Sequence, residues 1–188
     1  MSETDWPALQ ELIPHRGEAM LLERVLRHDG ESSEARVVVG SHRWLRREDG
    51  SVAMWLSVEY MAQCAAMHEG ILARSEGRPM PEGFLVAARK LAMHRSQFEP
   101  GQHLRISARR LQGRHGLGVL AYQCSIHADG DPEGVQGGSG VRASGELPHT
   151  SLLAAGRLTV ALSARRAASN DPTDPTGPTG PTGAMGLK

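Results

Sequence analysis

The sequence has few of the residues that disulfide-linked, zinc-bound or membrane-embedded proteins require. Its 188 residues include two cysteines, Cys64 and Cys124, and neither belongs to a C-x-x-C pair. This argues against a disulfide framework or a zinc site and is typical of a protein of the reducing cytosol. No uncharged apolar run reaches the ~18 residues of a membrane-spanning helix. The acidic N-terminus also lacks the apolar core of a signal peptide. We therefore expect a cytoplasmic protein without a membrane span.

Net charge and aromatic residues are also scarce. Lys plus Arg equals Asp plus Glu, at 21 each, so no overall charge indicates a nucleic-acid or membrane partner. Aromatics make up 4% of the chain, so the core must be built from Leu, Val, Ala, Ile and Met. The length suits one domain with a tail. Residues 171–188 consist mainly of Pro, Thr and Gly, which predicts a disordered tail.

The stretch 58–74, V-E-Y-M-A-Q-C-A-A-M-H-E-G-I-L-A-R, predicts a long central helix. At helical period its small residues share one stripe, formed by Ala62, Ala66, Gly70 and Ala73. Such a stripe lets another backbone approach closely, and we expect a curved sheet to do so. Gly70 costs roughly 1 kcal/mol in a helix relative to Ala, so a tight contact should compensate it.

Strand patterns surround this helix. Before it, a strand pair is expected around the Asp29-Gly30 turn. After it, the apolar patterns favour strands at 84–93, 103–111, 116–126 and 141–147. This order predicts an α+β domain over residues 1–147, with one helix packed on an antiparallel sheet. Residues 148–170 form an extension of uncertain structure, with a marginal amphipathic helix over Leu152–Arg166.

Three local motifs resemble the 3-hydroxyacyl-[acyl-carrier-protein] dehydratases of fatty-acid synthesis. These are L-I-P-H-R-G-E-A-M-L-L-E-R-V (Leu12–Val25), V-E-Y-M-A-Q (Val58–Gln63) and F-E-P-G-Q-H-L-R-I (Phe98–Ile106). Within that group, G-F-L-V-A-A-R-K (Gly83–Lys90) and E-Y-M-A-Q (Glu59–Gln63) are most similar to the dehydratase-like proteins of aryl-polyene biosynthesis. The resemblance implies a hot-dog fold, in which one long helix is wrapped by an antiparallel sheet, and it implies no metal or other cofactor.

The resemblance also implies a site. It assigns Glu59 and His42 as catalytic residues and Gln63 and His15 as substrate-binding residues, with Gln63 orienting Glu59 or the released water. In the family the histidine at the His15 position is not the catalytic one, and a structural role is the alternative for His15. In the family, a G-H-F-P-G-x-P-x-x-P-G loop before the helix carries the catalytic histidine. In Gly40–Ser57 only Gly40 and His42 match that loop, and its prolines are absent. An ordinary solvated histidine is therefore the alternative interpretation of His42.

Dehydration explains why these residue types are needed. Removing water from a 3-hydroxyacyl thioester requires a base for the α-proton and an acid for the leaving hydroxyl. A neutral histidine suits the first role, with an unperturbed pKa of about 6.5. A carboxyl group suits the second role only if it can carry or relay a proton. The helix dipole favours the charged form of Glu59, whereas burial opposes it. The alternative is that Glu59 and Gln63 are merely a polar first turn.

The implied function is dehydration of a 3-hydroxyacyl thioester on acyl carrier protein to the 2-enoyl thioester, in fatty-acid or polyene-type biosynthesis. The implied partners are the carrier protein and a second hot-dog subunit, as a homodimer or a heterodimer, because the family's acyl tunnels form between subunits. Two alternatives stay open: an acyl thioesterase, and a non-catalytic subunit that pairs with an active dehydratase. The basic residues between Arg89 and Arg114 are either a solvated sheet face or a landing surface for the acidic carrier.

Overall fold

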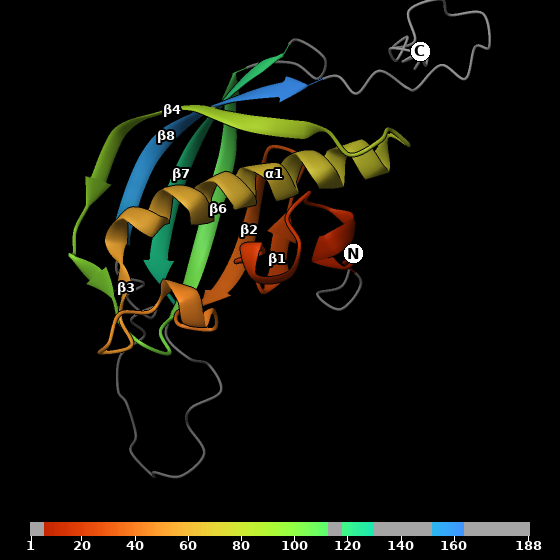
Figure 1. Ribbon diagram of the computed structural model, residues 1–188. Coiled ribbons are helices and arrows are strands. Elements are labelled where there is room, and N and C mark those ends of the chain that lie inside the picture. The colour runs from red at the N-terminus through yellow and green to blue at the C-terminus, as the bar shows by residue number, and fades with distance from the viewer. Residues whose placement is uncertain (1–5, 113–117, 130–151, 164–188) are drawn as a thin grey trace, which may run out of the picture.

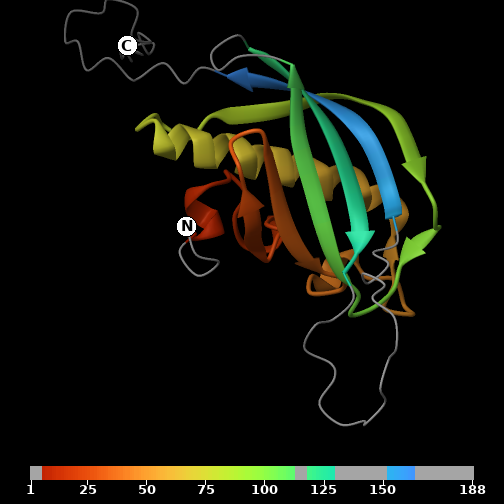
Figure 2. The same cartoon turned by 180° about the vertical axis from the view of Figure 1, so that it is seen from behind.

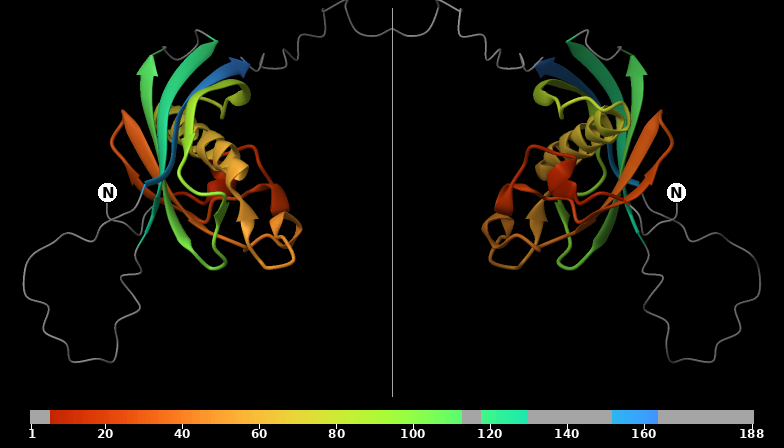
Figure 3. Two further views of the ribbon diagram at one scale, coloured as in Figure 1. Left: turned by 90° about the vertical axis from the view of Figure 1, so that its left-hand side faces the viewer. Right: turned by 90° about the vertical axis from the view of Figure 1, so that its right-hand side faces the viewer.

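The computed structural model describes residues 6–112, 118–129 and 152–163, and in these ranges one long helix packs on an antiparallel sheet (Figures 1 and 2). The helix is α1 (Ser57–Ser75). The sheet has the order β1-β2-β6-β7-β8-β4, with strands at Arg24–His28, Ser32–Val38, His103–Gln112, Val119–Ala128, Leu152–Ser163 and Glu82–Met93. Seen along the helix, the sheet curves around it (Figure 3). The predicted α+β class, the central helix and the strand pair around Asp29-Gly30 are confirmed.

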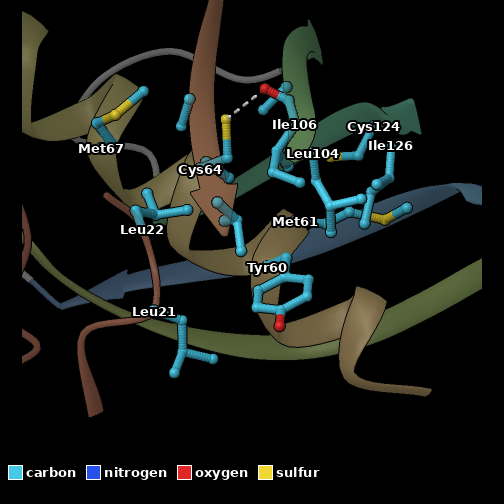
Figure 4. Close-up of a cluster of buried hydrophobic side chains, with 14 of the residues drawn as sticks. Leu21, Leu22, Tyr60, Met61, Cys64, Met67, Leu104, Ile106, Cys124 and Ile126 are labelled. Carbon is cyan, nitrogen blue, oxygen red and sulfur yellow. Dashed lines mark hydrogen bonds between the residues drawn. The ribbon is translucent and has the colours of Figure 1, made fainter. Parts of the chain in front are cut away.

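The core lies between α1 and the inner face of β2, β6 and β7. Side chains on these strands alternate between buried and partly exposed, as expected for a sheet covered on one face. The buried residues include Val37, Leu104, Ile106, Leu120 and Ile126. Figure 4 shows Tyr60, Met61, Cys64 and Met67 of α1 meeting this layer. The Cys64 thiol contacts the carbonyl oxygens of Ser33 and Ile106 at 3.5 Å each.

Both cysteines belong to this packed layer. Cys64 and Cys124 are free and buried. Burial raises the pKa of the Cys64 thiol well above its usual range and that of Cys124 to about 12. Because the thiolate is the reactive form of cysteine, neither thiol is suited to act as a nucleophile.

The stripe of small residues on α1 has two different neighbours. Ala62 and Ala66 are partly buried, pack against the core and line a cavity. At Gly70 the expected tight contact is present, but its partner is the segment before β1. A Cβ on Gly70 would lie 1.8 Å from the carbonyl oxygen of Leu12. Glycine is therefore required here so that the N-terminal segment can pack against the helix.

The C-terminal part of the sheet corrects one prediction. Leu152–Ser163 is strand β8 and not the amphipathic helix predicted from its sequence. It lies between β7 and β4, so residues after 147 belong to the same sheet as those before it. The strand predicted at 141–147 and the tail at 171–188 lie outside the described residues.

Several short elements frame the helix. The 3-10 turns are η1 (Leu9–Glu11), η2 (Gly17–Ala19), η3 (Arg43–Leu45) and η4 (Met54–Leu56). The strands β3 (Val52–Ala53) and β5 (Gln97–Phe98) pair with each other. Because the Ser57 N–H donates to carbonyls of η4, that turn leads directly into α1. Within the described ranges, no helix is long and apolar enough to span a membrane, and no cluster of side chains suits a metal ion.

Strand β4 forms one border of the sheet. Among the described strands it pairs with β8 alone, which leaves its other edge open. Its large apolar side chains are exposed on both faces, Phe84 by 63%, Leu85 by 42% and Val86 by 61%. Exposed apolar edge strands are usually protected or used for pairing. This border therefore differs from the buried centre of the sheet.

Candidate active site

A cavity of about 120 Å³ lies beside α1, under β4 and β8. Its lining combines an apolar wall with a few polar groups, the usual composition of a ligand site. The lining residues are Pro14, His15, Glu59, Ala62, Ala65, Ala66, Glu69, Pro81, Gly83, Leu85, Tyr122, Val160 and Leu162. Helix positions 59, 62, 66 and 69 follow the spacing of one helical face. The cavity therefore runs along the helix and has a carboxylate at each end.

Glu59 is the accessible carboxylate. Its side chain is 42% exposed, and its Oε1 lies 3.5 Å from Nε2 of His15. The Gln63 amide also donates a hydrogen bond of 2.9 Å to this oxygen. These contacts, with His15 the larger, hold the pKa of Glu59 below its usual value although burial opposes them. Glu59 is therefore a carboxylate at neutral pH, oriented by two neighbours.

Gln63 connects the helix to the segment before β1. Its Oε1 accepts a hydrogen bond of 2.8 Å from the Leu21 N–H, and its Nε2 donates one of 2.8 Å to the Ala19 carbonyl. The side chain is fully buried and is not part of the cavity lining. Gln63 thus positions Glu59 and the N-terminal segment.

His15 is brought to Glu59 by that same segment. Arg16 donates hydrogen bonds of 2.6 and 2.7 Å to the carbonyls of Ile13 and His15, which stabilises the turn. The imidazole lines the cavity. Its Nδ1 is buried and has no hydrogen-bond partner among the described residues. The sequence motif places His15 near the substrate, and the structure places it beside Glu59.

Glu69 lies at the other end of this lining, and no sequence motif marked it as a site residue. Its side chain is almost fully buried and accepts hydrogen bonds from Arg110 Nη2 and the Tyr122 hydroxyl. Burial and the Glu69 charge raise the pKa of Tyr122. Burial opposes the charge of Arg110, but its hydrogen bonds to Glu69 and Tyr122 raise its pKa overall. The arrangement is a locked ion pair with a neutral tyrosine.

His42 lies elsewhere. It precedes η3, where its carbonyl accepts the Leu45 N–H, and it is partly exposed. Of the described residues, those that line the Glu59 cavity include His15 and not His42. The assignment of His42 as the base stays a prediction. Among the described residues of one chain, the histidine that faces Glu59 is His15.

A model of the ApeP-like dehydratases, described as ApeP dehydratase, matches residues 7–138. The chain belongs to the ApeP-like dehydratase family. Among solved structures, the dehydratase heterocomplex ApeI:P from Xenorhabdus doucetiae matches with a TM-score of 0.71 and 18% identity, over 86% of this chain and 94% of that chain. A hypothetical thioesterase with coenzyme A from Streptococcus pneumoniae TIGR4 matches with a TM-score of 0.51 and 8% identity, over 76% and 87%. No curated protein sequence matches the chain.

The comparisons confirm two expectations. The fold of this ApeP-like protein is the hot-dog fold, because the helix wrapped by an antiparallel sheet is shared with these structures. The resemblance to hot-dog dehydratases, and among them to those of aryl-polyene biosynthesis, is also confirmed. At these levels of identity the structural matches show the fold alone, so the reaction has to be argued from the site.

Proposed function

We propose that this chain dehydrates a 3-hydroxyacyl thioester carried on acyl carrier protein, and that His15 moves the proton while the Glu59 carboxylate stabilises the imidazolium. The observation that supports this most directly is the pairing of an imidazole and a carboxylate, 3.5 Å apart, on the wall of an apolar cavity. The cavity offers a place for the acyl chain, and the pair offers a base with an oriented counter-ion.

In the proposed reaction His15 acts as base and then as acid. Neutral His15 takes the α-proton, and the C–H electrons form the new C=C bond as the Cβ–O bond breaks. The imidazolium, stabilised by the Glu59 carboxylate, then returns the proton to the departing hydroxyl, which leaves as water. Proton and charge balance are restored at the end of the cycle. This division of roles differs from the one expected from the sequence, because the lowered pKa of Glu59 makes it a poor proton donor.

We also propose that the site is completed by a second hot-dog subunit at the β4 edge. A cavity of about 120 Å³ is smaller than the ~300–1,000 Å³ of most ligand pockets. Gly83 and Leu85 line the cavity and also belong to the open border strand, so a subunit pairing there would extend the cavity wall. The ApeI:P structure is a dehydratase heterocomplex, which supports a different hot-dog chain as one form of this partner.

A second candidate function is that of a non-catalytic subunit. It is supported by the position of His42 outside the cavity and by the absence of the family's prolines from the loop that carries it. In that case the chain would shape the tunnel of an active dehydratase without moving a proton itself.

The test is an assay of the full-length chain on a 3-hydroxyacyl carrier-protein substrate, alone and with a second hot-dog dehydratase. Enoyl product from the chain alone supports the proposal, and free acid would show a thioesterase. Activity that requires an added dehydratase but is unchanged by His15→Ala would show a non-catalytic subunit.

Two matched variants assign the base. His15→Ala should lower kcat by about 10²–10⁴-fold, whereas His42→Ala should leave most of the activity. If the reverse is found, the histidine of the loop is the base, and the role proposed for His15 is wrong. Thermal unfolding of both variants checks that each is folded.

A further inference from the structure

The cavity lining extends along α1 from Glu59 to Glu69. Glu59 and Glu69 are ten positions apart on one face of α1. With a rise of 1.5 Å per residue, they are separated by about 15 Å along the helix. Between them the lining is apolar, with Ala62 and Ala66 on the helix and Leu85 and Val160 on the strands opposite.

At the Glu69 end, the lining carboxylate is held by groups that the rest of the fold fixes in place. Arg110 and Tyr122 are cross-strand partners on β6 and β7, so the sheet fixes their relative position. Both donate to Glu69, which is 2% exposed. The Tyr122 ring also packs edge-on against His68, with ring centroids 5.9 Å apart. An acyl chain that extended past Glu69 would have to separate the largely buried ion pair of Glu69 and Arg110, which is strongly unfavourable.

We infer that Glu69, Arg110 and Tyr122 set the maximum length of the acyl chain that the cavity accepts. This inference rests on the proposed function, because it assumes that the reacting carbons lie near Glu59. A peptide backbone advances at most ~3.6 Å over three bonds, or ~1.2 Å per bond. The distance of about 15 Å therefore holds an extended chain of about twelve bonds. The substrate class is an acyl chain of medium length, limited by a charged end wall.

The helix offers positions at which the cavity can be shortened in steps. Ala66 lies about 10 Å from Glu59 along the axis, and Ala62 lies about 4 Å from it. A leucine at either position would place a branched side chain in the path of the acyl chain. The accepted length should then fall to about nine bonds for Ala66→Leu and about four for Ala62→Leu. Ala8→Leu is a matched control, because Ala8 is exposed and outside the cavity lining.

The experiment measures Kd by calorimetry for saturated acyl-pantetheine thioesters of increasing length, bound to the full-length chain. Each methylene that enters the cavity should raise the affinity about three- to fourfold. In the wild type and in Ala8→Leu, this rise should stop near twelve bonds. It should stop earlier in Ala66→Leu and earliest in Ala62→Leu. If a leucine variant does not fold, Ala66→Val gives the same test with a smaller side chain.

Two results would overturn the inference. One is an affinity that continues to rise well beyond twelve bonds in the wild type. The other is a rise in affinity that stops at the same acyl-chain length in the leucine variants as in the wild type. Formation of enoyl product without any length limit would remove this inference and leave the proposed function standing. If no acyl chain binds at any length, either to this chain alone or in the presence of a second hot-dog dehydratase, the cavity is not an acyl site, and both proposals fail.

Discussion

The two carboxylates of the cavity share one face of α1 but have opposite surroundings. Glu59 is 42% exposed, and its neighbours are a histidine at 3.5 Å and a glutamine. Glu69 is 2% exposed and receives hydrogen bonds from Arg110 and Tyr122. Glu59 is accessible to a ligand and can exchange its partner, whereas Glu69 is held by groups that the sheet fixes. The same residue type on one helical face can therefore take part in the proposed reaction at one end of the cavity and limit the cavity at its other end.

The largest effect on stability should come from removing the Glu69 carboxylate, which Arg110 and Tyr122 hold in place. Glu69→Ala takes away the acceptor shared by Arg110 and Tyr122 and leaves a largely, though not fully, buried guanidinium without this counter-charge. The free energy of unfolding should fall by about 3–5 kcal/mol, as for other broken buried pairs. Glu59→Ala, at the accessible end, should cost less than about 1 kcal/mol. Urea unfolding of the two variants measures the difference, and equal losses would show that the two ends are not distinct.

The contact between Gly70 and Leu12, which holds the N-terminal segment against α1, should have the next largest effect. Gly70→Ala places a methyl group against the Leu12 carbonyl, so the N-terminal segment must move away from α1. Overpacking of this kind costs about 1–3 kcal/mol. Since His15 follows Leu12 by three residues, activity should fall as well. Ser75→Ala, in the exposed last turn, is the control. An unchanged thermal midpoint for Gly70→Ala would mean that this segment is not packed as described.

The smallest effect is a dependence of stability on pH. The contacts of Glu59 with His15 and Gln63 lower its pKa in the folded protein. A lowered carboxyl pKa stabilises the fold above the unfolded-state pKa of about 4.3. That contribution is lost as the pH falls from there through the folded-state pKa. Glu59→Gln should lack this part of the acid dependence, which urea unfolding between neutral and acidic pH would measure. Identical pH profiles for the variant and the wild type would contradict the pairing with His15.

Local patterns were sufficient to predict much of the fold. The small and apolar residues at helical period predicted the helix at 58–74, and it spans Ser57–Ser75. The turn at Asp29-Gly30 between two apolar stretches predicted the first strand pair. Strand β8 was missed because its Ala, Leu and Arg residues favour a helix, while its pairing with β7 and β4 depends on distant parts of the chain.

The site was only partly predictable, because its contacts are long-range. Glu59 was identified from its motif, and it does line the cavity. Glu69 lies outside the motifs that carry the family resemblance. Its partners Arg110 and Tyr122 are 41 and 53 residues away in sequence. The available signal was its position on the same helical face as Glu59 and the alanines between them. The place of His15 depends on the contacts of Gly70 and Gln63 with the N-terminal segment, which a linear motif does not contain.

The central claim is that Glu59 is the carboxylate that takes part in the reaction. The most direct test is the initial rate of enoyl formation by Glu59→Gln, measured together with its thermal midpoint. The substitution keeps the shape of the side chain and removes the charge that stabilises the imidazolium. We predict a rate about 10²–10⁴-fold below that of the wild type, with an almost unchanged midpoint. A variant that folds normally and keeps the full rate would contradict the account.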